Sequence, residues 1–443
     1  MGMKSRLKRI QILFLSIVLV FGTVILNPTK SYAFEKNEVD ALKENIKPLK
    51  SVKPDSEMDD LQFLKENLKD KTIIGMGEAT HGNKEIFNAK HRIFKFLVEE
   101  LNYKVFAIEG DFGGAEVVND YIVNGNGNPE DAVKSMGFWT WSTEEVVDMV
   151  NWMRKYNESV EDKDKIRFYG FDFQKYNTNK NLLKDYLNKS DKELADKYEN
   201  LLNDDIDSDY IKNTDNQKRE AIFSDLKKLQ DEMEQNKGKL INNSDEDEYE
   251  KALQNAKALK QFDEWIISNY SGNVRDKYMA ENVNWILNYE GKKGNNNIFL
   301  WAHNGHIDKN YTYPYVSMGK LLNDQYKEKY YAIGTEFYKS QFTAYNNMTD
   351  SKEKFEVETN KEWMADLFHE TGVSVGYVDL KDTCKNEVMG KIFESSQKMH
   401  SIGSTFNSMY SMFPQTYTLD TVPIKSFDGI VYIGEINPTV LLK

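Results

Sequence analysis

The stretch TIIGMGEATHG, residues 72–82, places a short apolar run directly before a glycine-containing loop that carries a glutamate and a histidine. Residues 85–101 follow with the pattern of a helix, and residues 105–108 form the next short apolar run. Strands that are buried on both faces, as in parallel sheets, are continuously apolar rather than alternating. The stretch therefore predicts the first strand–helix–strand unit of an α/β fold.

The same alternation continues along most of the chain. Further strands are predicted at residues 166–170, 297–301, 330–333, 373–378 and 429–433, and further helices at residues 115–123 and 144–156. Residues 178–290 depart from it, because they contain no proline, are rich in Lys, Glu, Asp, Asn and Leu, and repeat apolar residues at helical spacing. We therefore predict a mostly parallel central sheet covered by helices. Its domain is built from residues 34–177 and 291–443, with residues 178–290 as a long all-helical insertion.

The first 33 residues have the pattern of a secretory signal peptide. Basic residues at positions 4, 6, 8 and 9 precede an uncharged, mostly apolar run over residues 10–26, and Ser31-Tyr32-Ala33 is a small-x-small cleavage signal. The apolar run is 17 residues long, at the lower limit for crossing a bilayer, so an uncleaved anchor is the alternative. We expect cleavage after Ala33 and an extracellular protein, or one attached to the cell surface if the leader is retained.

Composition excludes several classes of function. The 443 residues include 58 basic and 71 acidic side chains, and a net charge of −13 argues against a protein that binds nucleic acid through a basic surface. The only cysteine, Cys384, excludes an intramolecular disulfide and a cysteine-based zinc cluster. A hydrophobic fraction of 40% is sufficient for a packed core.

Acidic residues and histidines directly follow the predicted strands. In an open parallel sheet, ligands bind beyond the carboxyl ends of the strands, so residues scattered along the sequence converge there. The residues that we expect at this edge are Glu78, His81, Glu109, Asp111, Asp172, His303, His306, Glu336, Asp379 and Glu435.

Such a cluster fits three kinds of chemistry. In the first, neutral His81 takes a proton from water that attacks a carbonyl, carboxylates such as Glu78 and Glu109 orient it, and protonated His303 or His306 contacts the oxyanion. In the second, histidine and carboxylate ligate a divalent metal such as zinc, manganese or iron. In the third, the acids cap the N-termini of the following helices. No cofactor is required by the first and third readings.

Other titratable residues favour plainer roles. For Asp172 and Asp379 we expect helix capping or loop hydrogen bonding. His369 and His400 are predicted to be surface residues of polar helices, and for His91 packing is at least as well supported as function. The zinc signature HExxH is missing from the sequence. The serine elbow GxSxG is also missing, which argues against an ordinary serine esterase.

Nine blocks in chain order, from Gly75 to Glu435, carry a resemblance to a known family. They are GMGEATHGNKEIFNAKHRIFKFLVEELNY, FAIEGDFGGAEVVNDYI, MGFWTWSTEEVVDMVNWMRKYN, IRFYGFD, RDKYMAENVNWIL, FLWAHNGHI, MGKLL, YYAIGTEF and FDGIVYIGE. Together they resemble the erythromycin esterase family. The resemblance implies an α/β hydrolase that opens the ring ester of macrolide antibiotics with water. It also implies a catalytic base and its partners: His81 is the base, Glu78 and Glu109 are the partner glutamates, and His303 and His306 are the later histidines.

Substrate contacts are expected from charged and aromatic residues. Family members commonly have Arg nine residues after the catalytic histidine, where this chain has Lys90, and Arg92 follows two residues later. An acidic rim that includes Asp111 and Glu336 suits the basic amino sugar of a macrolide. The aromatic residues that suit its large apolar ring, with core packing as their alternative role, are Phe138, Trp139, Trp141, Tyr311, Tyr313 and Tyr315.

Two alternatives stay open on the sequence. One is a metal-dependent hydrolase that uses the same histidines and glutamates. The other is a secreted binding protein that holds a haem, a metal or a polyketide without chemistry, because a fold does not by itself determine function. The expected partner is a small-molecule ester, with a macrolide as the example. Contact with a membrane is expected only if the leader is uncleaved.

Overall fold

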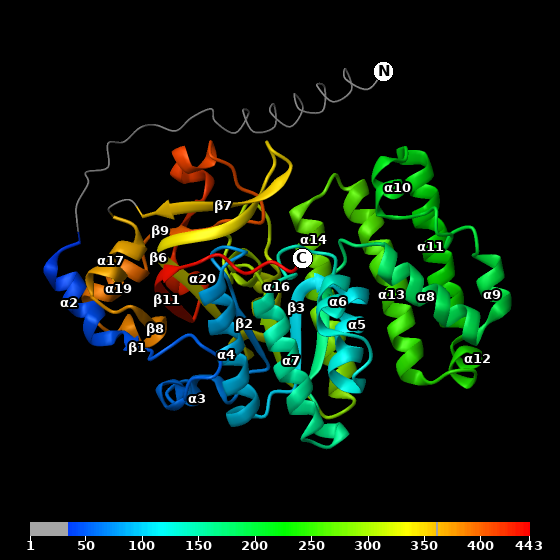
Figure 1. Ribbon diagram of the computed structural model, residues 1–443, viewed down its shortest axis with the longest axis horizontal. Coiled ribbons are helices and arrows are strands. Elements are labelled where there is room, and N and C mark those ends of the chain that lie inside the picture. The colour runs from blue at the N-terminus through cyan, green and yellow to red at the C-terminus, as the bar shows by residue number, and fades with distance from the viewer. Residues whose placement is uncertain (1–33, 360–361) are drawn as a thin grey trace. The chain divides into compact units, whose positions relative to one another are not determined.

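A central sheet runs through the computed structural model, which describes residues 34–359 and 362–443 (Figure 1). The predicted leader, residues 1–33, lies outside the described residues. The sheet has the strand order β1-β8-β11-β6-β2-β5-β3-β4, with β7 paired to β6. Its strands are β1 (Lys47–Pro48), β2 (Ile73–Met76), β3 (Val105–Asp111), β4 (Arg167–Asp172), β5 (Ile298–Trp301), β6 (Tyr330–Asn346), β7 (Ser351–Glu358), β8 (Val375–Asp379) and β11 (Gly429–Ile436).

The prediction of a mostly parallel sheet is confirmed. The neighbouring strands from β11 through β6, β2, β5 and β3 to β4 are all parallel. The strand predicted at residues 373–378 is present as β8, but it runs antiparallel to β11. Strand direction is set by the connections and not by the apolar pattern, so the sequence did not reveal it.

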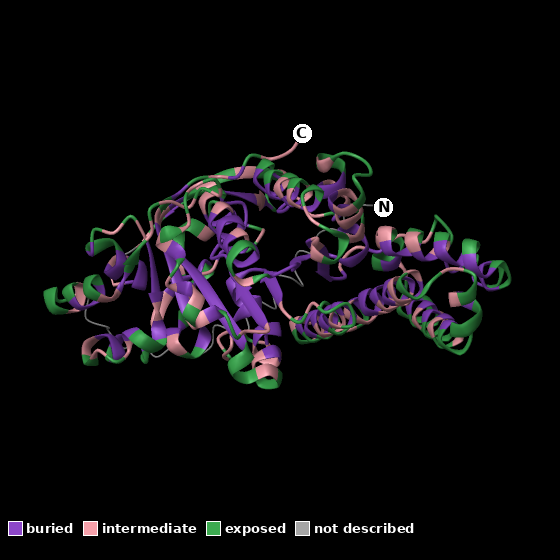
Figure 2. Cartoon of the chain, turned by 90° about the horizontal axis from the view of Figure 1, so that it is seen from below, coloured by how far each residue is buried: buried purple, intermediate pink, exposed green. Residues whose placement is uncertain are grey.

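Helices cover both faces of the sheet. One hydrophobic cluster joins α4 and α7 to side chains such as Ile74, Phe106 and Trp301, and a second joins α14 and α16 to the alternating side chains Ile73 and Val105. Figure 2 shows the resulting burial of the strands between the two helical layers. The helices around the sheet are α2 (Lys36–Asn45), α3 (Leu64–Leu68), α4 (Lys84–Leu101), α5 (Phe112–Asn124), α6 (Pro129–Ser135), α7 (Glu144–Glu158), α15 (Asn304–Ile307), α16 (Met318–Tyr326), α17 (Met364–Glu370), α18 (Leu380–Thr383), α19 (Glu387–Phe393) and α20 (Pro423–Ser426).

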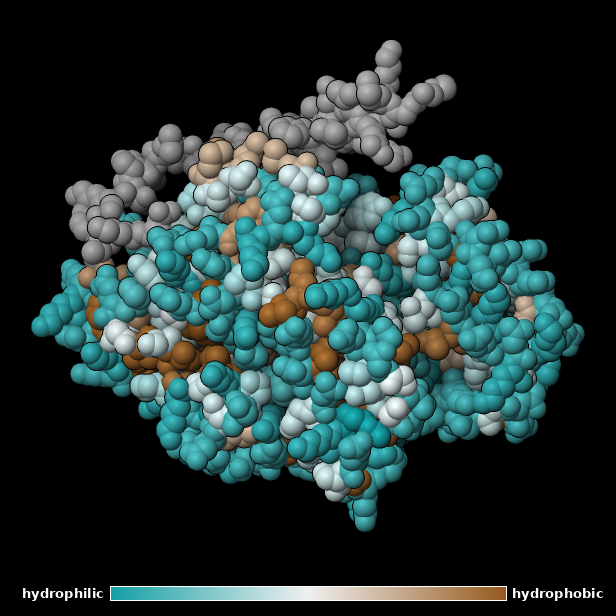
Figure 3. Space-filling view, viewed as in Figure 1, coloured by the Kyte–Doolittle hydropathy of each residue, from teal (hydrophilic) through white to brown (hydrophobic). Residues whose placement is uncertain are grey.

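The segment between β4 and β5 folds into helices with a core of their own. Apolar side chains such as Leu226, Leu229 and Phe262 form this third cluster, while the exposed charged residues make the surface of these helices mostly hydrophilic (Figure 3). The last helix, α14, instead packs on β4 and α16 and so belongs to the layers around the sheet. The helices are α8 (Asn177–Ser190), α9 (Lys192–Lys197), α10 (Ser208–Asn213), α11 (Asn216–Gln235), α12 (Lys237–Asn242), α13 (Glu246–Ile267) and α14 (Gly272–Gly291).

Four strands were not predicted, and the two-residue β1 at the edge of the sheet is one of them. The long strand β6 forms a hairpin with β7, whose sequence SKEKFEVE is highly charged, as is typical of an exposed edge strand. The last two of these strands, β9 (Gln397–His400) and β10 (Thr418–Thr421), form a separate antiparallel pair. The prediction of His400 as a surface residue of a helix is wrong, because its side chain is buried on β9. Within the described ranges, no helix combines the length and the hydropathy that a membrane span requires.

Candidate active site

The loop after β2 and the loop after β5 are joined by backbone hydrogen bonds. The N–H of Glu78 donates to the carbonyl of Ala302, and the N–H of Asn304 donates to the carbonyl of Glu78. Gly77 makes this approach possible, because a Cβ there would lie 2.2 Å from Oδ1 of Asn304. The two loops therefore carry His81 and His303 to one place, with ring centroids 5.2 Å apart.

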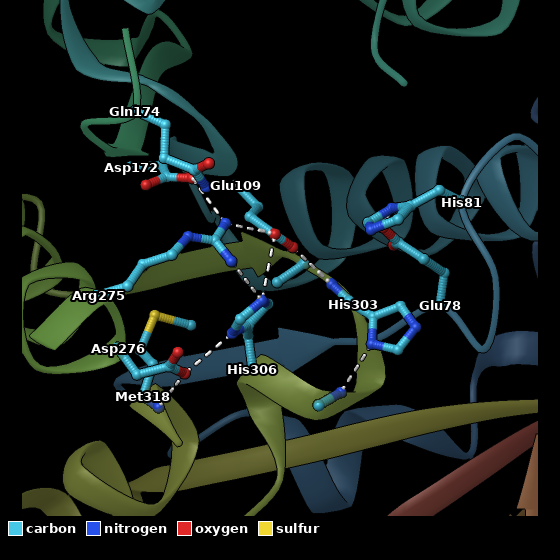
Figure 4. Close-up of polar contacts among 12 residues, drawn as sticks. Glu78, His81, Glu109, Asp172, Gln174, Arg275, Asp276, His303, His306 and Met318 are labelled. Atoms are coloured by element: carbon cyan, nitrogen blue, oxygen red, sulfur yellow. Dashed lines mark hydrogen bonds and ion pairs between the residues drawn. The ribbon is translucent and has the colours of Figure 1, made fainter. Parts of the chain in front are cut away.

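A cavity of about 500 Å³ opens at the carboxyl ends of the parallel strands. Four of the five predicted catalytic residues line it, and Glu78 lies behind His81 (Figure 4). The lining residues are His81, Glu109, Phe138, Trp139, Thr140, Trp141, Gln174, Arg275, His303, His306, Tyr313, Tyr315, Ser401, Gly403 and Ser404.

His81 is a neutral imidazole, and one of its two ring nitrogens makes no hydrogen bond to the described residues. Its Nδ1–H donates to Oε1 of Glu78 over 3.0 Å, so Nε2 carries the lone pair. Burial lowers the pKa of His81 to about 4, although the charge of Glu109 opposes this shift. Lys90 contacts the second carboxylate oxygen of Glu78 and donates to the carbonyl of Ala302 over 2.9 Å. His81 is therefore a proton acceptor whose ring orientation is fixed by its hydrogen bond to Glu78.

Glu109 accepts hydrogen bonds from several groups on the other side of the cavity. Its Oε1 accepts a hydrogen bond from Nη2 of Arg275 over 2.7 Å and lies 3.2 Å from Nε2 of His306, and its Oε2 accepts from the backbone N–H of His303 over 2.9 Å. Burial would raise the pKa of Glu109, but the charges of His306 and Arg275 hold it well below the usual range. Glu109 is therefore an ionised carboxylate with its acceptor sites engaged.

His306 is the positively charged histidine of the site. Burial disfavours its charge, but Asp276 and Glu109 raise the pKa of His306 to about 10, while the nearby Arg275 charge acts in the opposite direction. Its Nδ1–H donates to Oδ1 of Asp276 over 2.9 Å, and its Nε2 faces Glu109. His306 is protonated at neutral pH, and carboxylates of the protein occupy both of its N–H groups.

His303 is neutral, and both of its ring nitrogens are engaged. Its Nε2–H donates to the carbonyl of Ile402 over 3.1 Å, and its Nδ1 accepts from the N–H of Gly305 over 3.1 Å. Burial, with His81 close by, holds the pKa of His303 well below its usual value. The predicted oxyanion contact from protonated His303 is thus not available in this arrangement.

Arg275 and Asp276, in the first turns of α14, were not predicted as site residues. Arg275 joins Glu109 to Asp172, whose Oδ2 accepts from Nη2 of Arg275 over 2.7 Å. Asp172 also accepts from the N–H of Phe173, as expected for a loop carboxylate. The sequence signal was present in the block RDKYMAENVNWIL, which begins Arg275-Asp276, but the block lies in the helical segment rather than after a strand.

Four residues predicted to bind substrate do not line the cavity. Arg92 lies two positions after Lys90, about 200° around the helix, and donates to Oδ1 of Asp60 over 2.5 Å. Asp111 caps α5 by accepting from the N–H of Gly114 over 3.0 Å. Glu336 is buried and lies 2.5 Å from Nδ1 of His400. Lys90 likewise acts on Glu78 rather than facing the cavity.

Of the aromatic residues predicted to contact substrate, most line the cavity and one lies on the protein surface. Trp141 lies edge-on to His81 and donates its indole N–H to the carbonyl of Glu109 over 2.7 Å. Trp139 and Phe138, together with Tyr313 and Tyr315, complete the aromatic lining. Tyr311 is 65% exposed and does not line the cavity.

The fold and the cavity define an α/β protein with a buried site of histidines and carboxylates at the carboxyl ends of parallel strands. The family model described as erythromycin esterase matches residues 98–436, and the chain belongs to this family of hydrolases. Erythromycin esterase type II of Escherichia coli is 26% identical over 341 residues, which are 70% of this chain and 80% of that protein. The family match begins after Glu78 and His81, so their geometry carries the argument for their roles.

Two solved structures support the fold. A crystal structure of a Bacillus cereus protein has a TM-score of 0.81 at 26% identity and covers 93% of this chain and 100% of that chain. A mutant of the erythromycin esterase EreC in its open conformation has a TM-score of 0.66 at 15% identity and covers 88% of this chain and 98% of that chain. At 15% identity the likeness concerns the fold alone.

Proposed function

We propose that the protein hydrolyses a carboxylic ester with water activated by His81. The observation that carries this proposal is the hydrogen bond from Nδ1–H of His81 to Glu78, which leaves Nε2 of a cavity-lining histidine unprotonated and able to accept a proton. Membership of a hydrolase family supports the same reaction class.

Each step of the reaction uses a group that the site contains. The water oxygen attacks the ester carbonyl carbon while its proton passes to Nε2 of His81, and the carboxylate of Glu78 stabilises the imidazolium that forms. When the acyl C–O bond breaks, the imidazolium returns this proton to the leaving alkoxide. For a ring ester the product is a single molecule that has gained one water.

A macrolide is the substrate that we propose. The aromatic walls of the cavity suit an apolar ring, and the related E. coli protein is an erythromycin esterase. Incubation of the protein with erythromycin should yield, by mass spectrometry, a product heavier by one water. Tight binding without a change in mass would instead support the non-catalytic binding protein.

The His81→Ala variant tests the mechanism. Loss of a general base typically costs about 10²–10⁴ in rate, so we expect a decrease in kcat of that size while the circular dichroism spectrum shows that the fold is intact. The matched control is His369→Ala, because His369 is exposed and stacks on Tyr338 away from the cavity. Wild-type turnover by His81→Ala would contradict the assignment.

A metal-dependent version of the reaction is a second candidate. One ligand atom each from Glu78, His81 and Glu109 lie within 4.8 Å of one another. The metal mechanism is disfavoured because the two carboxylates already pair with Lys90, Arg275 and protonated His306. A metal ion would have to replace these positive groups as the partner of the carboxylates. We expect ester hydrolysis to remain complete after exhaustive chelation, in a protein sample that elemental analysis shows to contain no metal. Loss of activity on chelation, restored by one divalent metal, would favour the metal mechanism instead.

We also propose that the protein is secreted and that its leader is removed. The basic start, apolar run and Ser31-Tyr32-Ala33 exit support this proposal. The intact mass of protein recovered from the culture medium should correspond to a chain that begins at Phe34. Full-length protein in the membrane fraction would support the anchor instead.

A further inference from the structure

The proposed hydrolysis creates a negative oxygen that the catalytic histidines do not contact. Attack of water on the carbonyl carbon moves charge to the carbonyl oxygen, and one well-placed donor for this oxygen typically contributes about 10²–10³ in rate. Both ring nitrogens of His303 are engaged, and both N–H groups of His306 face protein carboxylates. Arg275 donates through Nη2 to Glu109 and Asp172, which hold its guanidinium in place. Its Nη1 lies 3.0 Å from Nε2 of His306 and cannot donate to it, because that nitrogen carries a proton.

Tyr315 offers a donor that the protein does not use. It lies between α15 and α16 and lines the cavity, and among the described residues its hydroxyl has no hydrogen-bond partner. The neighbouring Tyr313 differs, because its hydroxyl is paired with Oγ of Ser401 over 2.8 Å. The hydroxyl of Tyr315 is also not among the side-chain atoms that are buried without a partner, so it is not fully buried.

The ring of Tyr315 is held by packing on several sides. Its centroid lies 5.5 Å from that of Tyr313 and 6.3 Å from that of His306. It also packs closely on Gly272, where a Cβ would lie 2.8 Å from a ring carbon, so the first residue of α14 must be small. Burial, together with the carboxylate of Asp276, raises the pKa of Tyr315 above its usual range. Tyr315 therefore brings to the lining of the cavity a neutral hydroxyl that can donate its proton in a hydrogen bond.

We propose that the Oη–H of Tyr315 donates a hydrogen bond to the carbonyl oxygen of the ester and stabilises the oxyanion of the tetrahedral intermediate. This proposal rests on the ester hydrolysis proposed above. The tyrosine keeps its proton throughout and forms no covalent bond, so the proton balance of the reaction is unchanged. Its hydrogen bond strengthens as charge develops on the oxygen, which stabilises the transition state more than the bound substrate.

The test is Tyr315→Phe, which removes the hydroxyl and keeps the ring. With p-nitrophenyl butyrate as the probe ester, we expect kcat to fall about 10²–10³-fold with KM and the thermal midpoint unchanged. The matched control is Tyr311→Phe, an exposed residue outside the cavity, which should behave as wild type. An unchanged kcat, or an effect on KM alone, would overturn the proposal.

Transition-state binding provides an independent readout. A phosphonate analogue of the probe ester should bind Tyr315→Phe more weakly by the same factor as the loss in kcat, while butyrate, the product acid, should bind equally to both proteins. Trp139→Phe removes the indole N–H of another cavity residue, and a loss of kcat confined to this variant would assign the donor to Trp139 instead. If wild type and His81→Ala were equally inactive on both the probe ester and erythromycin, the proposed function itself would fail. Wild-type rates in Tyr315→Phe alone would remove only the role of the tyrosine.

Discussion

At the scale of single residues, Glu78 is a buried carboxylate that contacts both a histidine and a lysine. His81 occupies one of its oxygens and Lys90 the other, and the side chains of Glu78 and Lys90 are fully buried. Breaking such a pair on one side leaves a buried charge without compensation, which typically costs about 3–5 kcal/mol. Lys90 was expected to contact substrate, but its amine instead stabilises the carboxylate that orients the proposed base.

The Lys90→Met variant should therefore lose about 3–5 kcal/mol of unfolding free energy in urea titrations, together with most of its esterase activity. Adding Glu78→Gln removes the second charge, so the double variant should regain part of this stability and none of the activity. Stability equal to wild type in the single variant would show that the pair contributes nothing.

At the scale of secondary-structure elements, the site depends on how closely the loops after β2 and β5 approach. Gly77 lies against the backbone and side chain of Asn304, and a Cβ would be 2.8 Å from Cα of Asn304. Overpacking of this kind typically costs about 1–3 kcal/mol. Gly77→Ala should lower the thermal midpoint and reduce kcat, because it separates the loops that carry His81 and His303. Gly238→Ala is the control, since a Cβ at Gly238 meets nothing within 4 Å and should leave both quantities unchanged or raise stability slightly.

At the scale of the whole molecule, the buried histidines couple folding to pH. Burial lowers the pKa of His81 to about 4 from 6.5, so below pH 6.5 the unfolded chain takes up a proton that the native state does not, and stability decreases. His306 acts in the opposite sense: its pKa is raised to about 10 by Asp276 and Glu109 against the effect of burial. The stability that it contributes is complete below pH 6.5 and is lost as pH rises through 10. Unfolding free energy should therefore peak near pH 6.5, and His306→Gln should flatten the alkaline side; an unchanged alkaline slope would contradict this account.

Sequence patterns were enough to predict the parallel strands of the sheet, the helical segment and most residues at the edge of the sheet. These follow from local patterns, because short apolar runs form buried strands and the residues after them meet where parallel strands end. Which of these residues share the cavity, and which group each nitrogen binds, depends on contacts that form only in the folded chain. Arg275 and Glu109 are 166 residues apart in sequence, yet they lie 2.7 Å apart, and His400 is buried by strands that no apolar pattern marked. Pairing and burial arise from contacts between distant segments, and these contacts set the protonation of His81, His303 and His306.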